Sequence, residues 1–161
     1  MKRSIVASLA LAGIAFAGCS AYQSTYDREM QTLEQKAAAD RAAQEAAHEA
    51  AARYAAIVYF AVGSAEIGQE GQRELSWFVT QMQPYPQAMF DVQGFTDSTG
   101  GEATNAQLAR QRADAVANAL AGLGIAPERL VVQGFGETSP AATNVTKQGR
   151  RNNRRVEVTV R

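Results

Sequence analysis

The segment FDVQGFTDSTGGEATNAQLARQRADAVANALAGLG covers residues 90–124 and sets the fold class of the whole chain. From Phe90 to Gln93 apolar and polar residues alternate, which is typical of a strand with one buried face. From Asn105 to Leu123 small and apolar residues recur at helical spacing, and the glycines at its end favour a helix C-terminus there. The predicted buried stripe of this helix is Ala109, Ala113, Val116, Ala117 and Leu120. A strand, a polar loop and a long helix in this order indicate an α/β architecture.

The segments on both sides repeat this alternation of strands and helices. The predicted elements are a buried strand at 57–62, a helix at 70–83, a strand at 130–134, a short basic helix at 147–155 and a final strand at 156–160. We therefore expect an α/β (α+β) sandwich with the order β-α-β-α-β-(α)-β, in which helices pack on a small mixed sheet.

The first residues are typical of an export signal rather than of a folded element. Met1, Lys2 and Arg3 give a positive start, and the apolar run from Ser4 to Gly18 is too short to cross a bilayer comfortably. Ala17-Gly18-Cys19 resembles the bacterial lipobox, and the resemblance implies cleavage before Cys19 and attachment of diacylglycerol to its thiol. The alternative is an ordinary signal peptide that leaves Cys19 as a free thiol.

The next segment has the composition of an exposed helix. From about Thr25 to Arg53 it is rich in Ala, Glu and Gln and contains neither Pro nor Gly. Large apolar residues are too few for a confident coiled coil, although weak self-association through alanines stays open. The predicted organisation is a lipoprotein signal peptide at 1–18, a lipidated N-terminus and helical linker at 19–53, and a folded domain at 54–161.

Composition argues against several classes of function. The chain has 161 residues and balances 16 Lys and Arg against 16 Asp and Glu, so a general nucleic-acid-binding role is disfavoured. A single Cys and a single His leave metal sites and nucleophile–His triads without their parts. We therefore expect no metal, no cofactor and no enzymatic activity.

Polar residues gather where the strand at 90–94 ends. Asp97 lies in the following loop, and Asn105, Leu108 and Arg112 are spaced to share one face of the next helix. A carboxylate and a guanidinium directed to the same side form a plausible receptor for a zwitterion. The alternative is a purely structural salt bridge between Asp97 and Arg112.

Three spaced motifs then point to one family. The runs GFTDSTGGEATNAQLARQRADAV, QGFGETSP and GRRNNRRVEV occur in this order between Ile57 and Val160. Together they resemble the OmpA-like peptidoglycan-binding domain, and with the lipobox the chain is similar to Pal-type and related OmpA-family lipoproteins.

The resemblance implies a site for the diaminopimelate residue of Gram-negative peptidoglycan. Asp97 would pair with its ammonium and Arg112 would hold its carboxylate. The other implied site residues are Asn105 and Leu108 as ligand contacts, Thr96 as a residue that shapes the loop, and Arg154 at the border of the pocket. The sequence departs from the family pattern at Phe95, where His is usual, and at Ala61 and Gly63, where acidic and polar residues are common.

The implied protein is a non-catalytic outer-membrane lipoprotein that faces the periplasm and tethers the membrane to the cell wall. One alternative is an envelope assembly or signalling component that binds Tol-system proteins. Another is a peptidoglycan hydrolase with Asp97 as a general acid, for which Glu102 is the nearby second carboxylate in the sequence.

Overall fold

The computed structural model describes residues 16–161, with side chains from residue 23 onward in its first helix. The signal-peptide prediction for residues 1–18 falls almost wholly outside the described residues. The side chain of Cys19 precedes residue 23 and is not described either. The chain divides into two compact units, one ending at Gln44 and the other comprising Glu45–Arg161.

The helix α1 (Phe16–Ala51) makes up the described part of the first unit, and its last turns, from Glu45 onward, belong to the second unit. Its side chains are exposed from residue 23 to residue 49, which confirms the predicted exposed helix. Ala51 at its end is fully buried. Within residues 16–161, no helix combines the length and the apolar character that crossing a membrane requires.

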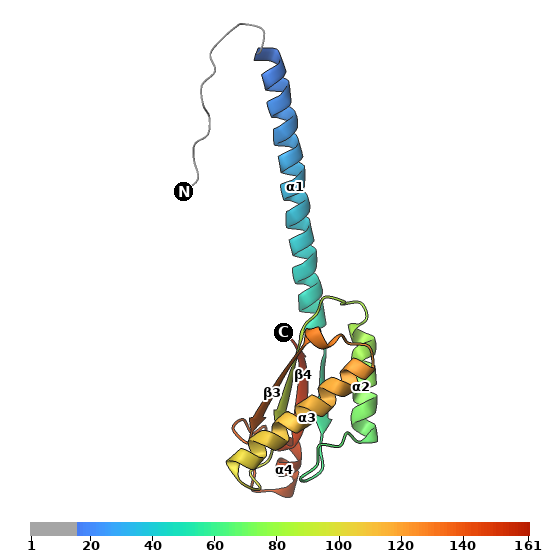
Figure 1. Cartoon of the computed structure of the whole chain (residues 1–161), viewed down its shortest axis with the longest axis vertical. Coiled ribbons are helices and arrows are strands. Elements are labelled where there is room, and N and C mark those ends of the chain that lie inside the picture. The colour runs from blue at the N-terminus through green and yellow to red at the C-terminus, as the bar shows by residue number, and fades with distance from the viewer. Residues whose placement is uncertain (1–15) are drawn as a thin grey trace. The chain divides into compact units, whose positions relative to one another are not determined.

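Four strands form one mixed sheet in the order β1-β4-β2-β3 (Figure 1). The strands are β1 (Ala55–Tyr59), β2 (Phe90–Phe95), β3 (Leu130–Gly136) and β4 (Arg155–Val160). β2 and β3 are parallel, whereas β4 runs antiparallel to both β1 and β2. The predicted small mixed sheet is therefore confirmed.

Helices α2 (Gln69–Met82) and α3 (Glu102–Gly122) cover one face of this sheet (Figure 1). A 3₁₀ turn, η1 (Pro127–Arg129), precedes β3, and a short α4 (Lys147–Asn153) precedes β4. One apolar cluster joins the two large helices to the sheet: Ala56, Val58, Leu75, Phe78, Met82, Phe90, Val92, Ala113, Val116, Leu120, Val156 and Val158. Each large apolar side chain in it contributes about 1.5–3 kcal/mol of burial free energy. The predicted stripe of α3 is buried throughout.

Two glycines allow α3 to lie directly on the sheet. A Cβ atom at Gly94 would collide with the carbonyl oxygen of Ala109, and one at Gly134 would lie 2.6 Å from the main-chain nitrogen of Arg110. Any side chain at either position would push the helix away from β2 or β3. The close approach holds the first half of α3 beside the loop that carries Asp97.

The first strand differs from its prediction. We expected a buried strand at 57–62, but β1 ends at Tyr59 and its residues are alternately buried and exposed. Ile57 is 42% and Tyr59 48% exposed, because β1 is an edge strand and α2 covers only one of its faces. Phe60 is buried in the following loop, whereas Val62 is 70% exposed there.

Candidate ligand-binding site

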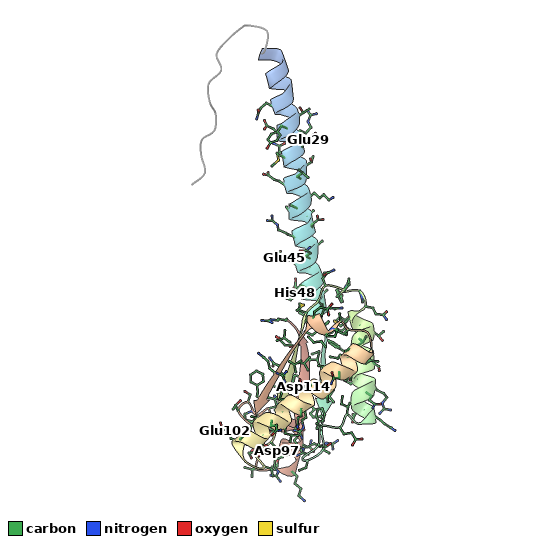
Figure 2. All side chains as sticks on the ribbon, viewed as in Figure 1. Glu29, Glu45, His48, Asp97, Glu102 and Asp114 are labelled. Carbon is green, nitrogen blue, oxygen red and sulfur yellow. The ribbon has the colours of Figure 1, made fainter. Side chains whose placement is uncertain are left out.

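Asp97 lies in the loop after β2, at the end of the domain where α3 begins (Figure 2). One carboxylate oxygen, Oδ1, accepts the main-chain N–H of Thr99 at 3.0 Å. The other, Oδ2, accepts Nη1 of Arg154 at 2.8 Å, in an ion pair whose side chains are only 7% and 12% exposed respectively. The partner of Asp97 is therefore Arg154 in the chain's C-terminal motif, and not Arg112 as the salt-bridge alternative supposed.

The surroundings of Asp97 favour its charged form. Burial by itself would raise the pKa of this carboxyl, but hydrogen bonds from Arg154 and Thr99, together with the charge of Arg154, hold the pKa below its usual value. The site thus contains a carboxylate that is ionised at neutral pH.

Arg112 has no exposed surface, and it joins three segments of the chain. Its Nε donates to the Ser64 carbonyl at 2.8 Å, Nη1 to the Phe95 carbonyl at 3.1 Å and Nη2 to the Ala61 carbonyl at 2.9 Å. Its guanidinium carbon also lies 5.2 Å from the centre of the Phe60 ring. Nη1 and Nη2 each carry a second N–H group in addition to the one that makes these bonds.

Burial lowers the pKa of Arg112 to about 10. The neighbouring charge of Arg154 acts in the same direction, whereas that of Asp97 opposes it. Arg112 therefore stays protonated at neutral pH. Its interaction with both neighbours shows that Asp97, Arg112 and Arg154 form one electrostatic cluster with a net positive charge.

The other expected site residues lie beside this cluster with different kinds of contact. Asn105 is buried, and its Nδ2 donates to Oε2 of Glu137 at 2.6 Å. Thr96 is buried as well; its N–H donates to the Gly136 carbonyl, but its hydroxyl has no hydrogen-bond partner. Leu108 is half-buried on α3.

Two contacts were not anticipated from the sequence. Glu137, the partner of Asn105, lies in the run QGFGETSP, which carried the family resemblance without indicating this role. Arg154 was expected at the border of the pocket, yet it bonds Asp97 directly and also donates Nε to the Phe60 carbonyl. The motif runs were the only sequence signal for either contact.

Glu102, the second carboxylate of the hydrolase alternative, is exposed in the first turn of α3. Among residues 16–161, no three or more His, Cys, Asp or Glu side chains are grouped so that they could hold a metal ion.

The family model described as "OmpA family" matches residues 59–154, which include the loop of Asp97, the strands β2 and β3 and the helices α2, α3 and α4. The chain belongs to the OmpA family. Its OmpA-like domain is similar to "Probable lipoprotein YiaD" of Escherichia coli K12, with 41% identity over 103 residues, or 64% of this chain and 47% of that protein. It is also similar to "Peptidoglycan-binding protein ArfA" of Mycobacterium tuberculosis H37Rv, with 43% identity over 75 residues, or 47% of this chain and 23% of ArfA. The matches thus span less than half of either relative.

Solved structures share the arrangement of the domain. The peptidoglycan-associated lipoprotein of Burkholderia pseudomallei has a TM-score of 0.63 and 27% identity, over 66% of this chain and 90% of that one. The cell wall anchor of the T6SS from Pseudomonas aeruginosa has a TM-score of 0.57 and 31% identity, over 66% of this chain and 79% of that one. The predicted OmpA-like fold is confirmed.

Proposed function

We propose that this protein binds the diaminopimelate stem peptide of peptidoglycan and tethers the outer membrane to the cell wall without catalysing a reaction. The observation that carries the proposal is the buried cluster of one carboxylate and two guanidinium groups, Asp97, Arg112 and Arg154, at the end of β2. Opposite charges held together in a partly buried site suit a ligand that carries an ammonium and a carboxylate. The names of ArfA and of the Burkholderia lipoprotein support the same class of ligand.

In this proposal Asp97 and Arg112 bind different groups of the ligand. Asp97 accepts the ligand's ammonium with lone pairs that Thr99 and Arg154 leave free. The ligand's carboxylate meets the remaining N–H groups of Arg112, which requires the segment 61–64 to move because Arg112 has no exposed surface.

The neighbouring polar groups complete the proposed site. The unpartnered hydroxyl of Thr96 supplies a further hydrogen bond to the ligand. Asn105, held by Glu137, and Leu108 line the α3 side of the site.

The N-terminal region supplies the attachment to the membrane in this proposal. Cys19 carries the lipid, and the part of α1 (Phe16–Ala51) that remains after cleavage before Cys19 is about 50 Å long at ~1.5 Å per residue. A helix of that length serves as a spacer between lipid and domain.

Co-sedimentation with sacculi tests the proposal. We expect Asp97→Asn to weaken retention on diaminopimelate-type sacculi at least tenfold, because the substitution keeps the shape of the side chain but removes its charge. Asp114→Asn is the matched control, since Asp114 lies on α3 in an exposed ion pair with Arg110. Equal retention of both variants contradicts the site, and release of soluble muropeptides by the parent protein contradicts a non-catalytic role.

The lipid anchor needs a separate test. Cys19→Ser should move the protein from the outer-membrane fraction to the soluble fraction, whereas Ser20→Ala should leave it in place. Membrane association of Cys19→Ser that matches the parent's contradicts lipidation at this residue.

A further inference from the structure

One edge of the sheet is open along β1. Among residues 16–161, this strand stands at the end of the sheet order and pairs with β4 alone. The N–H of Phe60, directly after β1, donates to the Arg154 carbonyl at 2.9 Å. Main-chain groups in an antiparallel pair face the partner strand at every second residue. Val58 and Ala56 therefore face β4, whereas the main-chain N–H and C=O groups of Ala55, Ile57 and Tyr59 point away from it.

The same three residues line a groove. Ala55, Ile57 and Tyr59 border a cavity of about 670 Å³ together with Gly68–Gly71 and Glu74 around the start of α2 and with Arg151 and Arg154 around α4. The strand Ala-Ala-Ile-Val-Tyr contains no Pro, charged residue or glycine that would discourage pairing. Soluble proteins usually protect sheet edges with such residues because an open edge accepts another strand.

The charges along the groove are ordered. α2 runs antiparallel to β1, because a Cβ at Gly71 would meet Val58 whereas the Trp77 ring lies 6.2 Å from that of Tyr54. Glu74, between these two positions, therefore lies beside the first half of β1. Arg151 lies at the other end, since its neighbour Arg154 contacts Phe60. Near Ala55 the charged lining residue is Glu74, whereas Arg151 and Arg154 lie near Tyr59 together with Glu70, which precedes Gly71 on α2. The end of the groove near Tyr59 therefore has more positive than negative side chains.

We propose that this groove binds an extended peptide of another protein as an added strand on β1, with an acidic group beside Arg151 and a basic side chain beside Glu74. Main-chain hydrogen bonds to Ile57 and Tyr59 supply affinity, and the two charges set the direction of the peptide. A second copy of the chain fits less well, because antiparallel pairing of two β1 strands would bring four carboxylates, Glu70 and Glu74 of each copy, into one groove with only two Arg151 side chains, since Arg154 is already paired with Asp97. The groove shares Arg154 with the proposed site around Asp97. The proposal nevertheless does not depend on peptidoglycan binding, since it rests on the edge of β1 and on Glu74 and Arg151, which the proposed site does not use.

Binding of defined peptides to the full chain in detergent tests this inference. The probe is the fluorescein-labelled hexapeptide Asp-Thr-Val-Thr-Val-Lys, whose acid reaches Arg151 when it pairs antiparallel to β1. Fluorescence anisotropy should show saturable binding, and a peptide that carries Asp at both ends should bind about fivefold more weakly because one charge pair is lost. N-methylation of the alternate amides that face β1 should abolish binding, whereas N-methylation of the other set should not.

Protein variants locate the binding at the groove. Arg151→Glu and Glu74→Lys should each weaken the probe about fivefold, and the double variant should prefer the charge-reversed peptide Lys-Thr-Val-Thr-Val-Asp. Ile57→Pro removes an outward N–H without touching the β1–β4 bonds and should abolish binding. Unchanged thermal unfolding serves as the fold check for the charge variants, and their sacculus retention should equal the parent's.

Three results overturn the inference. The first is no saturable binding of the probe. The second is binding that neither the charge variants nor N-methylation alters. The third is a concentration-dependent dimer that Arg151→Glu disrupts, which assigns the edge to a second copy of the chain. Loss of sacculus retention in Asp97→Asn with intact peptide binding leaves the groove in place and separates it from the proposed peptidoglycan site.

Discussion

Replacing Arg112 by Ala should strongly destabilise the domain, whatever its effect on ligand binding. The guanidinium is fully buried and donates to the carbonyls of Ala61, Ser64 and Phe95, which belong to the loop after β1 and to the end of β2. The substitution leaves these acceptors without their donor and opens a cavity beneath the Phe60 ring.

The expected loss follows from these contacts. A buried polar group that loses its partner costs about 1–3 kcal/mol. Three such carbonyls lose their donor, but water that enters the cavity will form hydrogen bonds with some of them. We therefore expect the free energy of unfolding to fall by about 3–6 kcal/mol. This is a large share of the ~5–15 kcal/mol that stabilises a typical domain. Arg112→Lys keeps the charge but not the planar guanidinium group, and it should lower the free energy of unfolding by less than Arg112→Ala does.

Urea unfolding of the full chain, followed by far-UV circular dichroism, measures the difference. Arg110→Ala is the matched control, because Arg110 lies on the same helix, is 56% exposed and pairs with Asp114. Arg110→Ala should lower the free energy of unfolding by less than about 1 kcal/mol. A loss below about 1.5 kcal/mol for Arg112→Ala, or equal losses for the two variants, would refute the view that Arg112 holds the loop to the sheet.

Three further predictions concern the same region. Because the folded protein holds the pKa of Asp97 below its usual value, this carboxylate stabilises the fold above pH ~4, and the contribution disappears as the pH falls through the lowered pKa. Urea titrations at several pH values should therefore show that the free energy of unfolding of Asp97→Asn falls less on acidification than that of the parent. Parallel pH dependences of the two proteins would contradict the ion pair. Gly94→Ala should sharply lower the urea concentration at the unfolding midpoint, since its Cβ would strike the Ala109 carbonyl, whereas Gly122→Ala, with open space around it, should not. Equal midpoints for the two variants would disprove the close approach of α3 to β2. Thr96→Val removes an unpartnered buried hydroxyl, so it should leave the free energy of unfolding unchanged or raise it by up to about 1 kcal/mol, while sacculus retention weakens. A fall in the free energy of unfolding of more than about 1 kcal/mol would show that the hydroxyl is bonded in the folded protein.

Local patterns in the sequence were enough for the elements and their order. Alternation from Phe90 to Gln93 and the helical spacing of Ala109, Ala113 and Leu120 depend on which side of a strand or helix a residue occupies, and burial selects that side within a few residues. The motif runs also led to Asp97 and Arg112, whose charges affect each other in the folded protein, although Asp97 bonds Arg154. The exposed face of β1 was missed, because an apolar run looks the same in the sequence whether one or both faces of the strand are covered.

The pairing of the charges was decided only by the tertiary structure. Asp97 and Arg154 are 57 residues apart, Asn105 and Glu137 are 32 apart, and Arg112 reaches carbonyls up to 51 residues away. No spacing along the chain encodes such contacts. The first arises when β4, inserted between β1 and β2, brings Arg154 to the loop of Asp97, and the other two arise where α3 packs beside the end of β3 and the loop after β1. A side chain's residue type sets which bonds it is able to make, whereas the folded sheet sets which partner lies within reach.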